Sequence, residues 1–186
     1  WKVTRWIRYL YGSTSKTSAV NTAEFTEFFE SYLKKGQDVF YIGLSSELSS
    51  TYHNALRAKQ ELEEKYPDRK IYIVESKLAS SSLGLILEKV VSMKNDGISL
   101  GEIYKWVEAN QTRFQTWVSA TDLSFLAKGG RLSAPKAFVG KMLKICPVLR
   151  INEEGKLVID EKIRSKKKSY QYLIDKYAST GVKDQK

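Results

Sequence analysis

The sequence predicts an α/β fold, in which a parallel sheet with flanking helices is followed by a second α/β domain. Two short segments rich in β-branched and aromatic residues, Val39–Ile42 and Lys70–Val74, have the composition of buried strands. Each is followed by a Ser-rich turn and then by apolar residues at helical spacing, and strand–helix units of this kind form parallel sheets. After residue 113 the pattern changes to short strands and a hairpin. We therefore expect an N-terminal α/β domain over residues 1–113 and part of a second over residues 114–186.

Four helices are expected in the N-terminal domain. The first begins after a capping residue, Asn21 or Thr22, and the fourth after Ser99, since short polar side chains accept hydrogen bonds from the free amides of a helix start. The second spans residues 52–66, where apolar residues recur at three- and four-residue steps. The third includes Leu83–Met93, which is apolar on nearly every side, so we expect this helix to be buried.

The second domain is expected to begin with a strand and to contain a hairpin around Glu154-Gly155. In chain order the expected elements are a strand at Trp117–Ala120, a short helix at Leu123–Leu126, a helix at Pro135–Lys144, the hairpin strands Val148–Ile151 and Lys156–Ile163, and a helix at Ser165–Tyr177.

The composition indicates the charge of a partner and argues against disulfide, metal-binding and membrane-inserted classes of protein. With 31 Lys and Arg against 21 Asp and Glu, the net charge of +10 suggests an acidic partner. One cysteine, Cys146, excludes an internal disulfide and fits a reducing cytoplasm. One cysteine, one histidine and no clustered carboxylates predict no metal site, and no apolar run is long enough for stable membrane insertion. The unpatterned aromatic start and the polar end of the sequence suggest a fragment, truncated at both ends.

Two pairs of hydroxyl side chains are candidates for binding a ligand. Thr17-Ser18 and Ser49-Ser50 each precede a predicted helix, where Ser and Thr also serve as simple caps. Both pairs are expected at the same edge of the sheet, and open α/β sheets bind ligands at this edge. Free backbone amides at a helix N-terminus attract anions. The arrangement therefore favours an anionic ligand.

A serine hydrolase is one alternative. The segment from Gly43 to Glu47 resembles half of a nucleophile elbow with Ser45 as nucleophile, but Glu47 stands where the second glycine is needed. The sole candidate for a catalytic base is His53, and a lone histidine more often packs or faces solvent. We therefore predict no catalytic residues, and a binding protein rather than an enzyme.

A nucleic-acid-binding protein is a second alternative, suggested by the charge of +10 and eleven tyrosines. Against it, the basic residues are scattered and form no recognition motif, so nucleic acid is not expected as a partner. The run Lys166–Lys168 opens a predicted helix, where positive charge opposes the helix dipole. This cost suggests that the run and Arg164 face an acidic surface.

Five separated segments together resemble the DegV family of bacterial fatty-acid-binding proteins. They cover the chain from about Lys16 to Tyr177 in the order and at the spacing of that family. The segments are Lys16-Thr17-Ser18, Leu44-Ser45-Ser46-Glu47-Leu48-Ser49-Ser50-Thr51-Tyr52, Glu75-Ser76-Lys77, Lys128-Gly129-Gly130-Arg131 and Glu161-Lys162-Ile163-Arg164.

The resemblance implies a two-domain protein that holds one long-chain fatty acid, such as palmitate, stearate or oleate, between its domains. The family's carboxylate-binding threonine and serine correspond to Thr17 and Ser49, and we include the neighbouring Ser18 and Ser50 in this site. The resemblance also implies a partner, a fatty acid kinase that phosphorylates the bound carboxylate. The basic residues thought to engage it correspond to Arg131, Arg164 and Lys167, and no cofactor is implied. Leu83, Ile86, Leu87, Phe138 and Met142 are candidates for the tunnel wall.

The chain departs from the family pattern at four places. The family's Gln-Pro after Thr-Ser is Ala19-Val20 here, and its glycine after Leu-Ser is Ser50. A side chain at Ser50 is expected to crowd the carboxylate or alter the turn. The family's opening Asp-Ser-Thr strand and its C-terminal His-x-Gly segment are also missing, and the histidine of that segment normally helps to hold the carboxylate.

Overall fold

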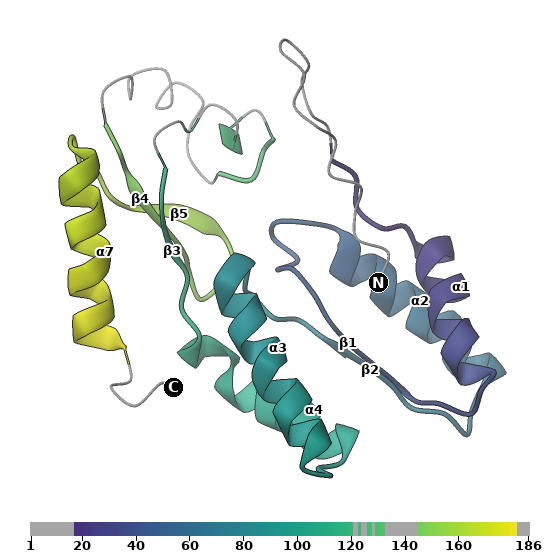
Figure 1. Ribbon diagram of the computed structural model, residues 1–186. Helices are drawn as coiled ribbons and strands as arrows, with labels where there is room; N and C mark the ends of the chain where they lie inside the picture. Colours follow the sequence, from purple (N-terminus) through teal and green to yellow (C-terminus); the bar gives the residue numbers. More distant parts are fainter. Residues whose placement is uncertain (1–16, 121–122, 124–125, 128, 133–144, 182–186) are drawn as a thin grey trace.

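The fold consists of two β-sheets side by side, each with helices packed against it (Figure 1). The computed structural model describes residues 17–120, 123, 126–127, 129–132 and 145–181. Its elements are α1 (Thr22–Leu33), β1 (Val39–Ile42), α2 (Thr51–Lys65), β2 (Ile71–Val74), α3 (Ser80–Asn95), α4 (Leu100–Asn110), η1 (Gln111–Arg113), β3 (Trp117–Ser119), β4 (Val148–Ile151), β5 (Leu157–Glu161) and α7 (Lys166–Thr180). The helix predicted at Pro135–Lys144 lies outside the described residues. Of the short helix predicted at Leu123–Leu126, only the first and last residues are described.

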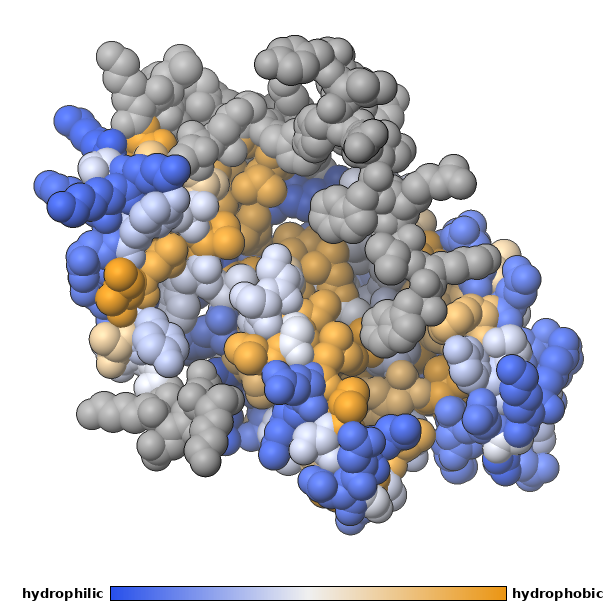
Figure 2. Space-filling view, in the orientation of Figure 1, coloured by the Kyte–Doolittle hydropathy of each residue, from blue (hydrophilic) through white to orange (hydrophobic). Residues whose placement is uncertain are grey.

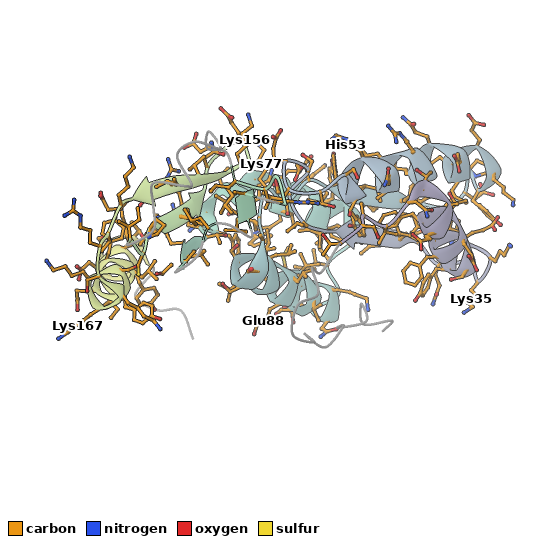
Figure 3. All side chains as sticks on the ribbon, turned by 90° about the horizontal axis from the view of Figure 1, so that it is seen from above. Lys35, His53, Lys77, Glu88, Lys156 and Lys167 are labelled. Atoms are coloured by element: carbon orange, nitrogen blue, oxygen red, sulfur yellow. The ribbon has the colours of Figure 1, made fainter. Side chains whose placement is uncertain are left out.

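The first sheet is parallel and covered by helices on both faces. Its strands β1 and β2 pair from Val39 opposite Ile71 to Ile42 opposite Val74. Because side chains alternate along a strand, successive residues join different cores. Val39 and Ile71 pack with α1 and α2, whereas Val74 packs with α3 and α4. Figure 3 accordingly shows α2 and α3 on opposite sides of this sheet.

The second sheet is antiparallel, in the order β3-β4-β5, and α7 lies against one of its faces (Figure 1). A hydrogen bond between the hydroxyls of Ser119 on β3 and Ser169 on α7, 2.6 Å long, joins helix to sheet. Leu149 projects to the other face, where it packs with Leu123 and Leu132. The predicted α/β class with a second α/β unit is therefore confirmed. The expected boundary at residue 113 stays a prediction.

Of the two residues predicted to cap α1, Asn21 and Thr22, the structure selects Asn21. Asn21 is the N-cap of this helix and accepts a hydrogen bond from the Glu24 amide, while the Glu24 carboxylate accepts one from the Asn21 amide. Ser99 and Glu102 form the same reciprocal pair at the start of α4. Two polar residues three positions apart therefore fix where each helix begins.

The prediction that the third helix is buried all round was wrong. On α3, Ile86 and Val90 are buried against β2 and α4, but Leu85 and Val91 are 50% and 53% exposed. Leu87 is exposed as well. The reason is geometric, because one sheet face and one neighbouring helix cover only part of a helix's circumference. In the described part of the chain, no helix is long and apolar enough to cross a membrane.

Glu30 joins α1 to α2 through an ionic cluster. Its carboxylate contacts Lys34 at 3.0 Å, accepts a hydrogen bond from the Tyr66 hydroxyl at 3.0 Å and pairs with Lys65 at the end of α2. Hydrogen bonds from Lys65, then from Lys34 and Tyr66, lower the pKa of Glu30 to about 2.

Substitution Glu30→Gln is expected to lower the melting temperature at neutral pH and to lose this effect in acid. The pKa of Glu30 is about 2 in the folded chain against 4.5 for the ordinary group. A depressed folded pKa contributes stability that is complete above the unfolded pKa and disappears as the pH falls through the folded pKa. Thermal unfolding followed by circular dichroism should therefore show a difference between wild type and variant that shrinks from pH 5 to about pH 2.

The matched control is Glu63→Gln, which removes a contact of 3.6 Å to Lys59 within α2 and no link between helices. Its melting temperature should follow that of the wild type across this range. A Glu30→Gln difference that stays constant with pH would contradict the assignment.

Candidate ligand-binding site

The turn between β1 and α2 is held in shape by Ser45. The backbone amides of Leu48 and Ser49 donate to the Ser45 carbonyl at 3.0 and 3.1 Å, and the Glu47 amide donates to Ser45 Oγ at 3.3 Å. Ser45 itself is fully buried. The chain therefore folds back on one residue, and this fold carries Ser49 to the start of α2.

Two hydroxyls meet at the end of this turn. Ser49 Oγ and Thr51 Oγ1 lie 2.7 Å apart, and the Thr51 amide donates to Ser49 Oγ at 3.3 Å. The hydrogen bond between the hydroxyls uses one of their two protons, so the other is available to donate to an acceptor from outside. This pair can therefore bind an anion without rearranging.

The N-terminus of α2 offers further donors beside this pair. Ser50 is the N-cap residue, but its side chain makes no capping hydrogen bond. Among the described residues, the backbone amides of Tyr52 and His53 have no hydrogen-bond acceptor, as expected in the first turn of a helix. The 15-residue helix also adds a partial positive charge at this end. The start of α2 therefore presents both hydroxyl and amide donors.

The second predicted pair, Thr17 and Ser18, lies in the segment that leads into α1. This segment is tied to α2, because the Asn54 side-chain amide donates to the Val20 carbonyl at 2.7 Å. Thr17 and Ser18 are exposed three and two residues before that anchor. The first turn of α2 thus contacts the segment that carries Thr17 and Ser18. The same turn directly follows Ser49 and Ser50.

Glu75, at the end of β2, supports the turn from the neighbouring strand. Its carboxylate accepts hydrogen bonds from the Ser46 amide at 3.1 Å and the Lys77 amide at 2.9 Å. Burial, and then the charge of Glu75, raise the pKa of Tyr41 to about 12 and also raise the pKa of Tyr52. The amides of Ser46 and Lys77 already have an internal anion, so a ligand must use the donors near Ser49.

The predicted basic residues occupy two different places. Arg131 is close to the turn, because its Nε donates to the Leu48 carbonyl at 3.2 Å. Arg164 and Lys167 are exposed at the start of α7, and Figure 3 shows Lys167 at one end of the molecule. The structure therefore brings Arg131 to the Ser-rich turn but not Lys167.

The geometry argues against a serine nucleophile. Ser45 Oγ is buried and donates to the Gly155 carbonyl at 2.8 Å, so it faces a backbone acceptor instead of a base. His53 is exposed, with its ring against that of Tyr52 at a centroid distance of 5.3 Å. No group of three potential metal ligands occurs within the described ranges. Catalysis by this serine therefore finds no support.

Part of the surface is apolar. Figure 2 shows apolar residues gathered from the second sheet across to α3, with the surface hollowed between them. A separate cavity of about 140 Å³ lies at the junction of η1 with β3 and β4, lined by Gln111, Trp117 and Arg150 among others. Ligand pockets usually have at least about 300 Å³, so this cavity alone is too small for a long acyl chain.

The comparisons with known proteins identify the family. A sequence profile of the DegV family matches residues 8–186. The chain belongs to the DegV family. A DegV domain-containing protein of Clostridium perfringens, CPE0026, is 40% identical over 163 residues, which are 88% of this chain and 56% of that protein.

Solved DegV structures share the fold. The DegV protein SAG1342 of Streptococcus agalactiae, described as fatty acid binding, matches with a TM-score of 0.82 and 27% identity over 94% of this chain and 61% of that one. The fatty acid kinase (Fak) B3 protein of Streptococcus pneumoniae, loaded with linoleic acid, matches with a TM-score of 0.80 and 26% identity over 91% of this chain and 59% of that one. The chain thus spans little more than half the length of these DegV relatives.

The sequence did not predict that three residues hold the turn between β1 and α2. The sequence suggests Ser45 only as a nucleophile or as one residue of a matched segment, and Gly155 only as part of a hairpin turn. Glu75 stood in one of the matched segments, and its position directly after a strand was a usable signal. Their contacts join residues 29 to 110 positions apart, which spacing along the chain does not reveal.

Substitution Glu75→Gln is expected to destabilise the DegV chain by about 1–2 kcal/mol, because hydrogen bonds to a charged acceptor exceed those to a neutral one by this amount. Urea unfolding at neutral pH measures the loss. The control is Glu88→Gln on α3, an exposed residue whose side chain makes no hydrogen bond or ion pair within the described part of the chain (Figure 3). Its effect should stay within about 0.5 kcal/mol, and equal losses in both variants would refute the supporting role of Glu75.

Proposed function

We propose that this chain binds a long-chain fatty acid, such as palmitate, stearate or oleate, and presents its carboxylate to a partner fatty acid kinase. The observation that carries the proposal is the set of hydroxyl and amide donors at the start of α2. It occurs in a fold shared with proteins described as fatty acid binding. The single cysteine fits a reducing compartment, and we place the chain in the cytoplasm.

The carboxylate is bound by Ser49 and Ser50 on one side and by Thr17 and Ser18 on the other. The spare proton of the Ser49–Thr51 pair donates to one carboxylate oxygen, in line with the 2.7 Å spacing of these hydroxyls. Each hydrogen bond to a charged group contributes about 1.5–3 kcal/mol. Ser50 replaces the family's glycine, and its side chain makes no capping hydrogen bond, which leaves its hydroxyl available to the carboxylate.

The acyl chain supplies most of the affinity. Burial of one CH₂ group contributes about 0.8 kcal/mol, so a dozen contribute on the order of 10 kcal/mol, more than the head group. Of the predicted wall residues, Ile86 is fully buried in the core next to α4 and serves packing. Leu83 and Leu87 are accessible and remain wall candidates, while Phe138 and Met142 lie outside the described residues.

The phosphoryl transfer belongs to the partner. The site contains donors that orient a carboxylate, and the described part of the chain places no base against these hydroxyls. The exposed cations Arg164 and Lys167 suit an acidic partner surface. Arg131 lies at the turn itself, so it connects the head group to the surface that the kinase approaches.

Substitutions Ser49→Ala and Thr17→Val are each expected to weaken palmitate binding about tenfold, the equivalent of one lost hydrogen bond to a charge. Both side chains are at least partly accessible, so the melting temperature should change little. Displacement of a fluorescent fatty acid gives the dissociation constants.

The control for this experiment is Ser46→Ala, in the same turn. The Ser46 hydroxyl makes no hydrogen bond within the described ranges, and its amide is bound to Glu75. This variant should retain the wild-type affinity. Unchanged palmitate affinity in both Ser49→Ala and Thr17→Val would overturn the proposed site.

Reversal of charge at the start of α7 tests the kinase interaction. The double variant Arg164→Glu, Lys167→Glu is expected to reduce phosphorylation of the bound fatty acid by the kinase about tenfold while palmitate affinity stays unchanged, because rim charges act mainly on association. Lys35→Glu, at the opposite end of the molecule in Figure 3, is the control. Equal rates for the double variant and the wild type would exclude this surface.

A further inference from the structure

The hairpin between β4 and β5 reaches the Ser-rich turn of the first sheet. The Gly155 carbonyl, at the hairpin tip, accepts a hydrogen bond from Ser45 Oγ at 2.8 Å, and both residues are buried. Figure 3 shows Lys77 and Lys156 close together where the hairpin meets the first sheet. The contact is therefore an internal one between the two sheets.

Gly155 has no room for a side chain. Its φ of +88° is in the left-handed region, and a Cβ here would overlap Ser45 Oγ and lie 3.5 Å from Lys77 Cα. The Lys77 backbone would be at an ordinary van der Waals distance, so the obstacle is the Ser45 hydroxyl. A side chain at position 155 must therefore displace Ser45 Oγ from the Gly155 carbonyl, and the positive φ adds backbone strain.

A second contact falls on the same turn. Arg131, in the loop that precedes the second sheet's hairpin, donates through Nε to the Leu48 carbonyl at 3.2 Å. Two segments from the later half of the chain thus hold residues 45 and 48. Ser49 follows directly, and its amide donates to the Ser45 carbonyl.

We propose that Ser45 and Gly155 are positioning residues, through which the hairpin of the second sheet sets the location of the Ser49 hydroxyl. This inference rests on the proposed function for the identity of the ligand. The hairpin touches Ser45, Ser45 accepts the amides of Leu48 and Ser49, and Ser49 carries the donor. Displacement of the hairpin therefore weakens carboxylate binding, although every residue that contacts the carboxylate is unchanged.

The test compares Gly155→Ala with Gly36→Ala. Gly36, at the end of α1, also has a positive φ of +73°, but a Cβ there meets nothing within 4 Å. Both variants carry the same kind of backbone strain, and only Gly155→Ala collides with Ser45. The difference between them therefore isolates the contact between hairpin and turn.

Two readouts are used on the full chain. The first is the dissociation constant for palmitate and for 1-hexadecanol, which has the same tail but no carboxylate. Gly155→Ala should lose about tenfold in palmitate affinity and keep its hexadecanol affinity, since one hydrogen bond to a charge is misplaced. A role in general stability would weaken both ligands equally.

The second readout, amide hydrogen exchange without ligand, separates this inference from the proposed function. The amides of Leu48 and Ser49 should exchange about tenfold faster in Gly155→Ala than in Gly36→Ala, because their acceptor is displaced. Equal exchange, or equal losses for acid and alcohol, would overturn the inference. A wild-type chain that binds neither ligand would refute the proposed function, while the exchange comparison would still decide on the contact.

Discussion

The hydrogen bonds that converge on Ser45 are the constraint on which the candidate site depends. A single buried residue accepts the amides of Leu48 and Ser49 through its carbonyl and reaches Gly155 with its hydroxyl. Unsatisfied buried polar groups are costly, so the loss of any of these bonds is unfavourable. The position of Ser49 is thus determined both by the end of β1 and by a hairpin more than a hundred residues later.

The parallel sheet explains why several loops meet there. The carboxyl ends of β1 and β2 lie at one edge, which brings Glu75 beneath the turn that follows β1. Glu75 saturates the nearest amides, and the donors that stay available are those of α2 and of Ser49. The local structure therefore leaves these groups as the candidate donors for an anion.

Much of this fold follows from local sequence. The strand Val39–Ile42, the hairpin around Gly155 and the cap residues Asn21 and Ser99 rest on residue patterns a few positions long, and they were predicted correctly. The burial of α3 was not, because apolar residues around a helix do not reveal how many neighbours cover it. The role of Ser45 also required the structure, since its partner is 110 residues away. Residue patterns within a segment can be interpreted from the sequence, whereas contacts between distant segments require the structure.

The absent side chain at Gly155 has a consequence for how this protein tolerates mutation. The Ser45 hydroxyl fills the space that a Cβ at position 155 would need. A change at one position therefore alters which residues the other can accept. Glycine at position 45 would make room for a methyl group at 155, yet it would leave the Gly155 carbonyl without its donor and the backbone still in a left-handed conformation. The two positions are therefore epistatic, because the effect of a substitution at either one depends on the residue at the other.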